Sequence, residues 1–205
     1  MNDTIEKNEY SMAGWFAIAA AVLTLPMFGL SLTVDIVAKK APGIAMMVLL
    51  PYVVVTVCHT AFSIYAFIRF RTLLNRRHAF HEVDALVTAI VIGVIIITVT
   101  ALPIKVLNTL GLIGMPLIIG FIAFIFIFAM TMGVISIIFA VKLLRLDNDL
   151  NGFLKPYAYI TIAAAACFAL VITAPLGMII DAVGNVVLAL IFLKPEAEAT
   201  QPEFV

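Results

Sequence analysis

The residues that could carry chemistry in this chain are few, and most lie inside long apolar stretches. His59 stands between Thr56 and Thr60 in the middle of one such stretch. An imidazole in that setting could ligate haem, relay a proton or contact a quinone. The plainer alternative is a neutral histidine that hydrogen-bonds to a neighbouring helix. The other histidines, His78 and His81, fall in a basic loop, so two histidines on one haem are not expected.

Asp181 and Asn185 are a second polar pair within an apolar stretch. They are four residues apart, so they face the same way if the segment is helical. Buried in a helix that starts near Pro175, the pair could bind a cation or a proton. We favour a turn at residues 181–184, because Asp, Asn and Gly are typical of turns. Both residues would then be ordinary turn residues at the membrane surface.

Polar residues also recur at a fixed step along the chain. Asp35, Asn108 and Asp181 are each 73 residues apart, and the same shift aligns residues 63–120 with 136–193. This pattern indicates three tandem helical hairpins in the same sense, the last one shortened. The three residues would mark the outer ends of the odd-numbered helices and converge on a vestibule. The alternative is that apolar helices of similar length align by composition alone. The predicted polar site therefore consists of Asp35, Asn108, Asp181 and Asn185.

No catalytic or metal-binding motif accompanies these residues. The sequence has no phosphate-binding loop, no serine-hydrolase elbow, no HExxH and no dinucleotide fingerprint. Cys58 and Cys167 lie in separate apolar stretches without zinc-ligand spacing, and we interpret them as small hydrophobic residues. A thiol pair brought together from two helices is the alternative. We expect no catalytic residue, no metal, no enzymatic activity and no motif-implied cofactor, with His59 the one weak candidate ligand.

The elements that position these residues are membrane helices. Of 205 residues, 64% are hydrophobic and 12% are charged, and the mean hydropathy is +1.20. A soluble domain is about 45–50% apolar and about 25% charged, and a small soluble fold cannot hide this much apolar surface. The composition excludes a soluble enzyme and a disordered chain. Twelve basic and twelve acidic residues cancel, so no basic field indicates a nucleic-acid partner.

The apolar stretches predict one all-α transmembrane domain over residues 1–205, with polar tails at 1–10 and 194–205. A helix needs about 20 residues to cross the hydrocarbon core. The C-terminal region has enough chain for two short crossings, and the alternative is one crossing plus a short apolar segment. We expect the first stretch to remain as an uncleaved anchor, because it is longer than a signal sequence and follows acidic residues. The six predicted spans are 11–34, 43–68, 85–103, 116–141, 156–175 and 176–193.

The distribution of Lys and Arg predicts the orientation. With six spans, Lys39, Lys40 and Lys105 fall on one side and the remaining nine of the twelve basic residues on the other. Short cytoplasmic loops carry the excess of basic residues, so both termini are expected in the cytoplasm. We predict a multi-pass protein of a prokaryotic cytoplasmic membrane.

Small residues indicate how the helices pack. Such residues on one stripe let membrane helices approach closely. The fourth span instead carries Phe121, Phe124 and Phe128 on one face, which suits lipid or a partner subunit. The hypothesis is that the first, third and fifth helices are central and the fourth is outside. The small-residue stripes are Ala13, Ala17 and Ala21; Ala85, Ala89 and Gly93; and Thr161, Ala165, Ala169 and Thr173.

These observations support three hypotheses about function. The first is a small transporter or channel-like bundle, or an accessory membrane subunit, without catalytic activity. The second is a membrane redox or haem-binding protein that uses His59. The third is a structural module that packs through its fourth helix. The expected partners are the lipid bilayer and either a second copy of the chain or another membrane subunit, with no nucleic acid.

Overall fold

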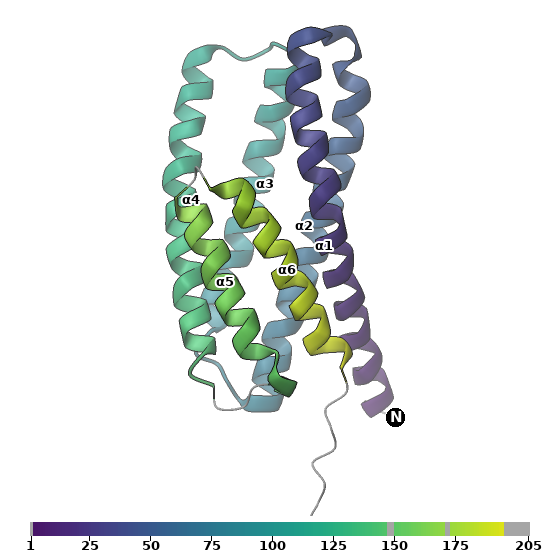
Figure 1. Cartoon of the computed structure of the whole chain (residues 1–205), viewed down its shortest axis with the longest axis vertical. Coiled ribbons are helices and arrows are strands. Elements are labelled where there is room, and N and C mark those ends of the chain that lie inside the picture. Colours follow the sequence, from purple (N-terminus) through teal and green to yellow (C-terminus); the bar gives the residue numbers. More distant parts are fainter. Residues whose placement is uncertain (1, 147–149, 171–172, 195–205) are drawn as a thin grey trace, which may run out of the picture.

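The computed structural model describes residues 2–146, 150–170 and 173–194, and this part of the chain forms helices joined by short connections (Figure 1). The predicted all-α helix bundle is confirmed. Short 3-10 turns occupy Pro42–Ile44 and Leu150–Gly152. The six α-helices are α1 (Asn2–Lys40), α2 (Ala45–His78), α3 (Asp84–Thr109), α4 (Met115–Leu143), α5 (Leu154–Ala169) and α6 (Ala174–Leu193).

Five of the six helices are long and apolar enough to cross a membrane, and α5 is the short one. Its 16 residues rise only about 24 Å, less than the roughly 30 Å of a hydrocarbon core. The other helices extend beyond their predicted spans, because a helix continues into the polar region once it has left the apolar one. The predicted N-terminal tail is helical from Asn2, and residues 195–205 of the C-terminal tail lie outside the described residues.

The connection between α5 and α6 lies earlier in the chain than the sequence analysis placed it. The Thr173 hydroxyl donates a hydrogen bond to the Cys167 carbonyl (2.9 Å), which satisfies an acceptor at the end of α5. Pro175 stands in the first turn of α6, where its missing N–H costs nothing. The predicted boundary between the fifth and sixth spans, at residues 175 and 176, is therefore wrong. The interpretation of residues 181–184 as a turn is also wrong, because Asp181 and Asn185 lie within α6.

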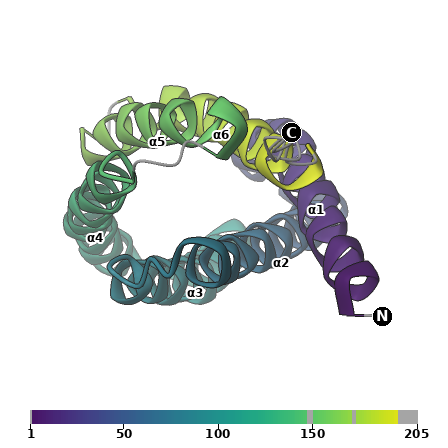
Figure 2. The ribbon, with the colours of Figure 1, turned by 90° about the horizontal axis from the view of Figure 1, so that it is seen from below.

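The helices form a ring in chain order, in which each packs against the next and α6 closes the ring against α1 (Figure 2). The three hairpins α1–α2, α3–α4 and α5–α6 point the same way, as the repeat predicted, and the third is shorter (Figure 1). The prediction that α1, α3 and α5 are central is wrong. Short connections make sequence neighbours pack side by side, and none of the six helices occupies the middle of the ring.

The two ends of the ring differ in what they contain. We call the end with the α1–α2 and α3–α4 turns the hairpin end. The opposite end, which holds the start of α1, the end of α6 and the α2–α3 and α4–α5 connections, is the terminal end. Helix α5 ends and helix α6 begins between the two, at about mid-height (Figure 1).

Small residues do bring adjacent helices together. Ala13 and Ala17 of α1 are completely buried. A Cβ atom on Gly14 would meet the Leu193 side chain of α6 at 2.6 Å. Between α4 and α5, a Cβ on Gly133 would lie 3.0 Å from the Ala165 carbonyl oxygen. The stripes on α1 and α5 therefore act in packing as predicted, but between neighbours around the ring.

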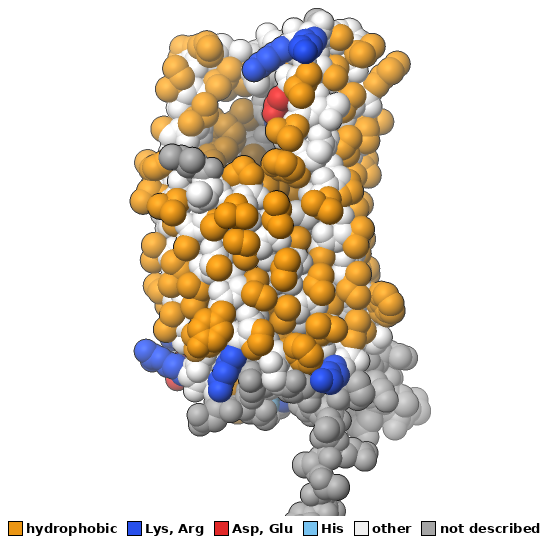
Figure 3. Space-filling view, in the orientation of Figure 1, with side chains coloured by type: hydrophobic (Ala, Val, Ile, Leu, Met, Phe, Trp, Pro, Cys, Tyr) orange, Lys and Arg blue, Asp and Glu red, His pale blue; other side chains and the backbone are white. Residues whose placement is uncertain are grey.

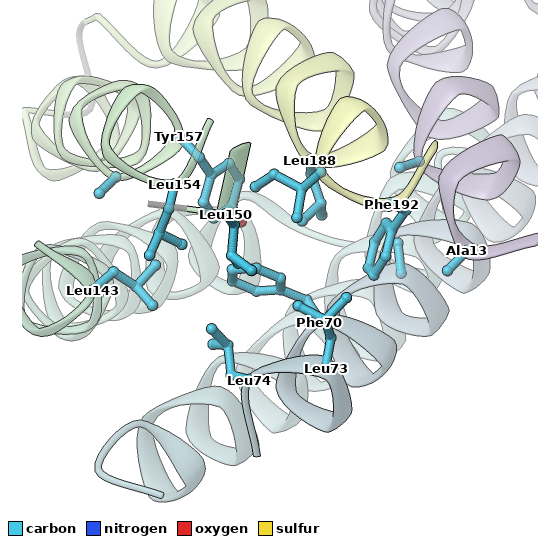
Figure 4. Close-up of a cluster of buried hydrophobic side chains, with 14 of the residues drawn as sticks. Ala13, Phe70, Leu73, Leu74, Leu143, Leu150, Leu154, Tyr157, Leu188 and Phe192 are labelled. Atoms are coloured by element: carbon cyan, nitrogen blue, oxygen red, sulfur yellow. The ribbon is translucent and has the colours of Figure 1, made fainter. Parts of the chain in front are cut away.

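A cluster of apolar side chains fills the middle of the ring at the terminal end (Figure 4). Phe70 is at its centre and fully buried. Its ring lies 5.3 Å from that of Tyr157 on α5 and 6.4 Å from that of Phe192 on α6. Since these contacts cross from one wall of the ring to the other, they close its interior. We call this cluster the plug: Phe70, Leu73, Leu74, Leu143, Leu154, Leu188 and Phe192.

The hairpin end lacks a comparable core. Every residue from 94 to 132 is described, and none of them is buried. This segment covers most of α3, the turn that follows and more than half of α4. The interior of the ring is therefore not filled by side chains on this side.

Candidate functional site

The polar residues of the helices gather around a cavity of about 310 Å³ inside the ring. We call this cavity the chamber. Its polar lining comes from both long walls of the ring, whereas apolar residues of α3 provide much of the rest. The chamber is within the size range of small-molecule sites. The polar lining residues are Thr56, His59, Thr60 and Ser63 of α2, Thr98 of α3, Tyr157 of α5, and Asp181 and Asn185 of α6.

Helical spacing explains why these side chains face inward together. Residues 56, 59, 60 and 63 of α2 follow the i, i+3, i+4, i+7 pattern, which places them on one face. On α6, Asn185 Nδ2 donates to Asp181 Oδ2 (3.2 Å), so these two side chains also share a face. Between them, Gly184 is buried against Ile160 of α5. Gly184 therefore serves close packing between α5 and α6, and it is not part of a turn as its sequence context suggested.

His59 connects the chamber to α1. Its Nε2 lies 3.3 Å from the hydroxyl of Thr24, and Thr24 is almost completely buried. That hydroxyl donates its proton to the Ala20 carbonyl (3.1 Å), so it accepts from Nε2–H of the imidazole. This arrangement corresponds to the neutral histidine that bonds to a neighbouring helix. The remaining ring nitrogen, Nδ1, is then left with a lone pair to offer as an acceptor.

Asp181 is the acidic residue of the chamber. It is solvent-accessible within the ring, and Asn185 is its one hydrogen-bond donor among the described residues. Where both side chains are described, the ion pairs involve Asp35, Glu82 and Asp84, and none of them involves Asp181. A carboxylate in an apolar helix without a basic partner is costly, so Asp181 is a candidate functional residue.

The space in front of Asp181 continues towards α4. A second cavity of about 380 Å³ shares Ile90, Val94, Ile97 and Asp181 with the chamber. Its remaining walls come from α4 and α5 and are almost entirely apolar. Asp181 therefore stands where two adjoining cavities meet, with polar groups on the α2 side and apolar groups on the α4 side.

Two hydroxyl groups complete the α2 side. Thr60 and Thr98 bring their oxygens to 3.4 Å across the α2–α3 contact. The Oγ of Ser63 is buried and has no hydrogen-bond partner among the described residues. An unpaired buried hydroxyl is unfavourable unless water or a ligand satisfies it. Ser63 therefore adds a buried hydroxyl to the polar lining of the chamber on α2.

The structure divides the predicted outer vestibule. At the hairpin end, Lys105 Nζ donates to Ser31 Oγ (2.8 Å) and to Asp35 Oδ2 (3.0 Å). Asn108 and Lys105 line a separate cavity of about 230 Å³. Asp181 is not part of this group, because α6 starts at mid-height and runs from there to the terminal end (Figure 1). Asp35 and Asn108 thus belong to the hairpin end, and Asp181 and Asn185 belong to the chamber with His59.

The sequence analysis did not single out Ser63, Thr98 or Tyr157 as site residues. For Ser63 a signal was available, since it is seven residues beyond Thr56 on the same helical face as His59. Thr98 and Tyr157 belong to other helices, α3 and α5, and only the closure of the ring brings them to the chamber.

Access to the chamber is unequal at the two ends. The plug closes the terminal end. On the opposite side, the molecular surface is hollowed above the short α5–α6 hairpin, between α4 and α1 (Figure 3). The short third hairpin therefore leaves part of the ring wall incomplete towards the hairpin end.

Comparison with known proteins identifies no relative: no family model matches the chain, and no curated protein or solved structure has significant similarity to it. Within the described residues, no three His, Cys, Asp or Glu side chains converge as metal ligands would. Cys58 and Cys167 are both free thiols. The composition and the five long apolar helices make this chain a multi-pass membrane protein.

Proposed function

We propose that this protein is a small membrane transporter that binds a solute in the chamber and exposes it to one end of the ring at a time. The observation that carries the proposal is a polar chamber inside an apolar helix ring, closed on one side by the plug. Polar groups inside membrane helices are costly and are retained where they serve a pathway. Binding sites of transporters lie between their helices, near the middle of the membrane.

The proposed cycle requires two rearrangements. In the proposed cycle, the conformation described here exposes the chamber towards the hairpin end, where the ring wall above α5 and α6 is incomplete. Release at the terminal end requires the plug residues of α2 to separate from those of α5 and α6. The α3–α4 hairpin would then move inward, and it is suited to this because residues 94–132 contribute nothing to a buried core.

The proposal includes an orientation. The hairpin end holds Lys39, Lys40 and Lys105, whereas the terminal end carries the other basic side chains of the described helices and loops. This excess of basic residues supports a terminal end that faces the cytoplasm. The chamber would then open to the opposite side of the membrane.

Cysteine accessibility tests this proposal. In a variant with Cys58→Ala and Cys167→Ala, a single cysteine is introduced at Thr98, which lines the chamber. The matched control is Val99→Cys, because the Val99 side chain is 64% exposed and is not among the residues that line the chamber. Both are treated in oriented vesicles with the membrane-impermeant cation 2-(trimethylammonium)ethyl methanethiosulfonate, which reacts with thiolates in water.

The cysteine at Thr98 is expected to react quickly from the hairpin side and more slowly from the terminal side, where the plug must open first. The cysteine at Val99 is expected to stay unmodified because it faces lipid. No reaction at Thr98 from either side would overturn a water-accessible chamber. Reaction from the hairpin side alone would contradict transport and indicate a one-sided binding protein.

The haem hypothesis has less support from the geometry. His59 is paired with Thr24, and His78 lies 19 residues further along α2, about 28 Å away by helical rise. The chamber therefore offers no second imidazole from the described residues, although Met27 lines it and could act as an axial ligand. The absorption spectrum of the purified protein tests this hypothesis: a Soret band lost in His59→Ala would support it.

The hypothesis of a module that packs through α4 rests on exposed apolar side chains. Phe124 and Phe126 are 41% and 46% exposed. Exposed apolar residues of similar size occur on the other long helices as well, so α4 differs little from a lipid-facing surface. No feature of α4 favours a protein partner over lipid.

A further inference from the structure

We propose that the solute bound in the chamber is a small organic monocation with an apolar body, whose charge pairs with Asp181. This inference rests on the proposed function and names its substrate class. It is argued from the charge balance of the cavity walls, from the donors and acceptors that they present, and from the shape of the space around the carboxylate.

The charge balance leaves one negative group to be matched. Neither the chamber nor the adjoining cavity has a Lys or Arg among its described lining residues. Lys105, a basic residue within α3, is already held by Asp35 and Ser31 at the hairpin end. His59 is engaged with Thr24. A monocation would therefore supply the missing charge, whereas an anion would be repelled by Asp181.

The ligand groups favour an organic cation over a metal ion. Calcium and magnesium require about six or more oxygen ligands, usually with several carboxylates. Around Asp181 there is one carboxylate and one amide, and no cluster of three acidic, His or Cys groups lies among the described residues. A single carboxylate suffices to balance the charge of an ammonium group, quaternary or not.

The surrounding walls suit an apolar body. Opposite Asp181 stand the aliphatic side chains of Ile90, Val94 and Ile97, which line both cavities. Aromatic rings of Phe67, Phe128 and Phe168 line one cavity or the other. Aromatic faces attract cations, most strongly where water is excluded. Apolar walls with a few placed polar groups are typical of sites for small organic molecules.

The experiment measures binding of a cation and an anion of the same size. The probes are benzyltrimethylammonium and benzylsulfonate, titrated calorimetrically into the full-length protein in nanodiscs. The wild-type protein is expected to bind the cation at one site and not the anion. Asp181→Asn is expected to weaken cation binding at least about tenfold, because a desolvated charge loses its partner.

Asp35→Asn is the matched control. It removes an equivalent carboxylate that is bound to Lys105 outside the chamber, so cation affinity is expected to stay within about twofold of the wild-type value. Equal affinity of Asp181→Asn and the wild type would overturn the proposal. So would failure of the wild type to bind the cation, which would leave Asp181 as a proton site only.

A second measurement does not depend on the folding of Asp181→Asn. Benzyltrimethylammonium is expected to slow modification of the cysteine at Thr98, and benzylsulfonate is not. Equal protection by both probes, or by neither, would overturn the proposal.

The two proposals fail separately: a cysteine at Thr98 that reacts but is not protected by the cation contradicts the cationic substrate alone. A cysteine that does not react contradicts the accessible chamber itself.

Discussion

The terminal half and the hairpin half of the ring share α1 to α4 but are packed differently, and α5 and α6 lie in the terminal half alone (Figure 1). In the terminal half, all six helices contribute buried side chains to one cluster. In the hairpin half, α3 and α4 have no buried residue between 94 and 132. One half therefore resembles a protein core, and the other resembles a wall between lipid and a cavity. The comparison indicates which half holds the ring together and which half is free to move.

The largest expected effect comes from opening the core of the terminal half. Phe70→Ala removes the side chain at the centre of the plug, and a buried Phe→Ala change costs about 3–5 kcal/mol in a well-packed core. The free energy of unfolding, measured by denaturant titration in detergent, should fall by this order. The same variant should speed modification of the cysteine at Thr98 from the terminal side.

Phe124→Ala is the control for that change. Phe124 is 41% exposed on α4, so its removal should alter the free energy of unfolding by less than about 1 kcal/mol. Similar losses in the two variants would show that the halves are equally packed and would remove the basis of the comparison.

An intermediate effect is expected where α4 meets α5. Ala165 is 3% exposed and lies against Gly133, so Ala165→Leu must push the two helices apart. Overpacking of this kind costs about 1–3 kcal/mol. Ala89→Leu on α3 should cost less, because Ala89 is only half-buried. Thermal unfolding of both variants in one detergent measures the difference, and a larger loss for Ala89→Leu would contradict it.

The smallest effect is expected at the hairpin end. Lys105→Met removes the ion pair with Asp35, whose side chain is 53% exposed. Exposed ion pairs contribute about 0.2–1 kcal/mol. A double-mutant cycle with Asp35→Asn should give a coupling energy in that range that falls as salt is added. A coupling well above about 2 kcal/mol, or one insensitive to salt, would mean that the hairpin end is as firmly held as the terminal end.

The sequence was sufficient to predict the elements and insufficient to predict their arrangement. Six helices and three hairpins in the same sense followed from apolar stretches and polar breaks. The end of α5 was not predicted correctly, because Asp181 and Gly184 were interpreted as a turn. Pro175 and Thr173 were the better evidence, since a proline in the first helical turn and a hydroxyl at the preceding helix end are local features.

The candidate site was predictable only in part. His59, Asp181 and Asn185 were identified because polar residues stand out in apolar helices. Their meeting in one chamber depends on α6 closing the ring against α1, which places α6 opposite α2. Asp35 and Asn108 were identified by their fixed step along the chain and lie at the hairpin end, whereas Asp181, predicted beside them by the same step, lies in the chamber.

What the sequence by itself determined is that this chain enters a membrane as apolar helices, because hydropathy and helix length are properties of each segment alone. The tertiary structure decided which faces of those helices meet. The burial of Phe70, the pairing of His59 with Thr24 and the isolation of Asp181 each depend on residues far apart in the chain. Closing the ring placed apolar side chains together at one end and left polar ones around a cavity in the middle, and no single helix contains that information.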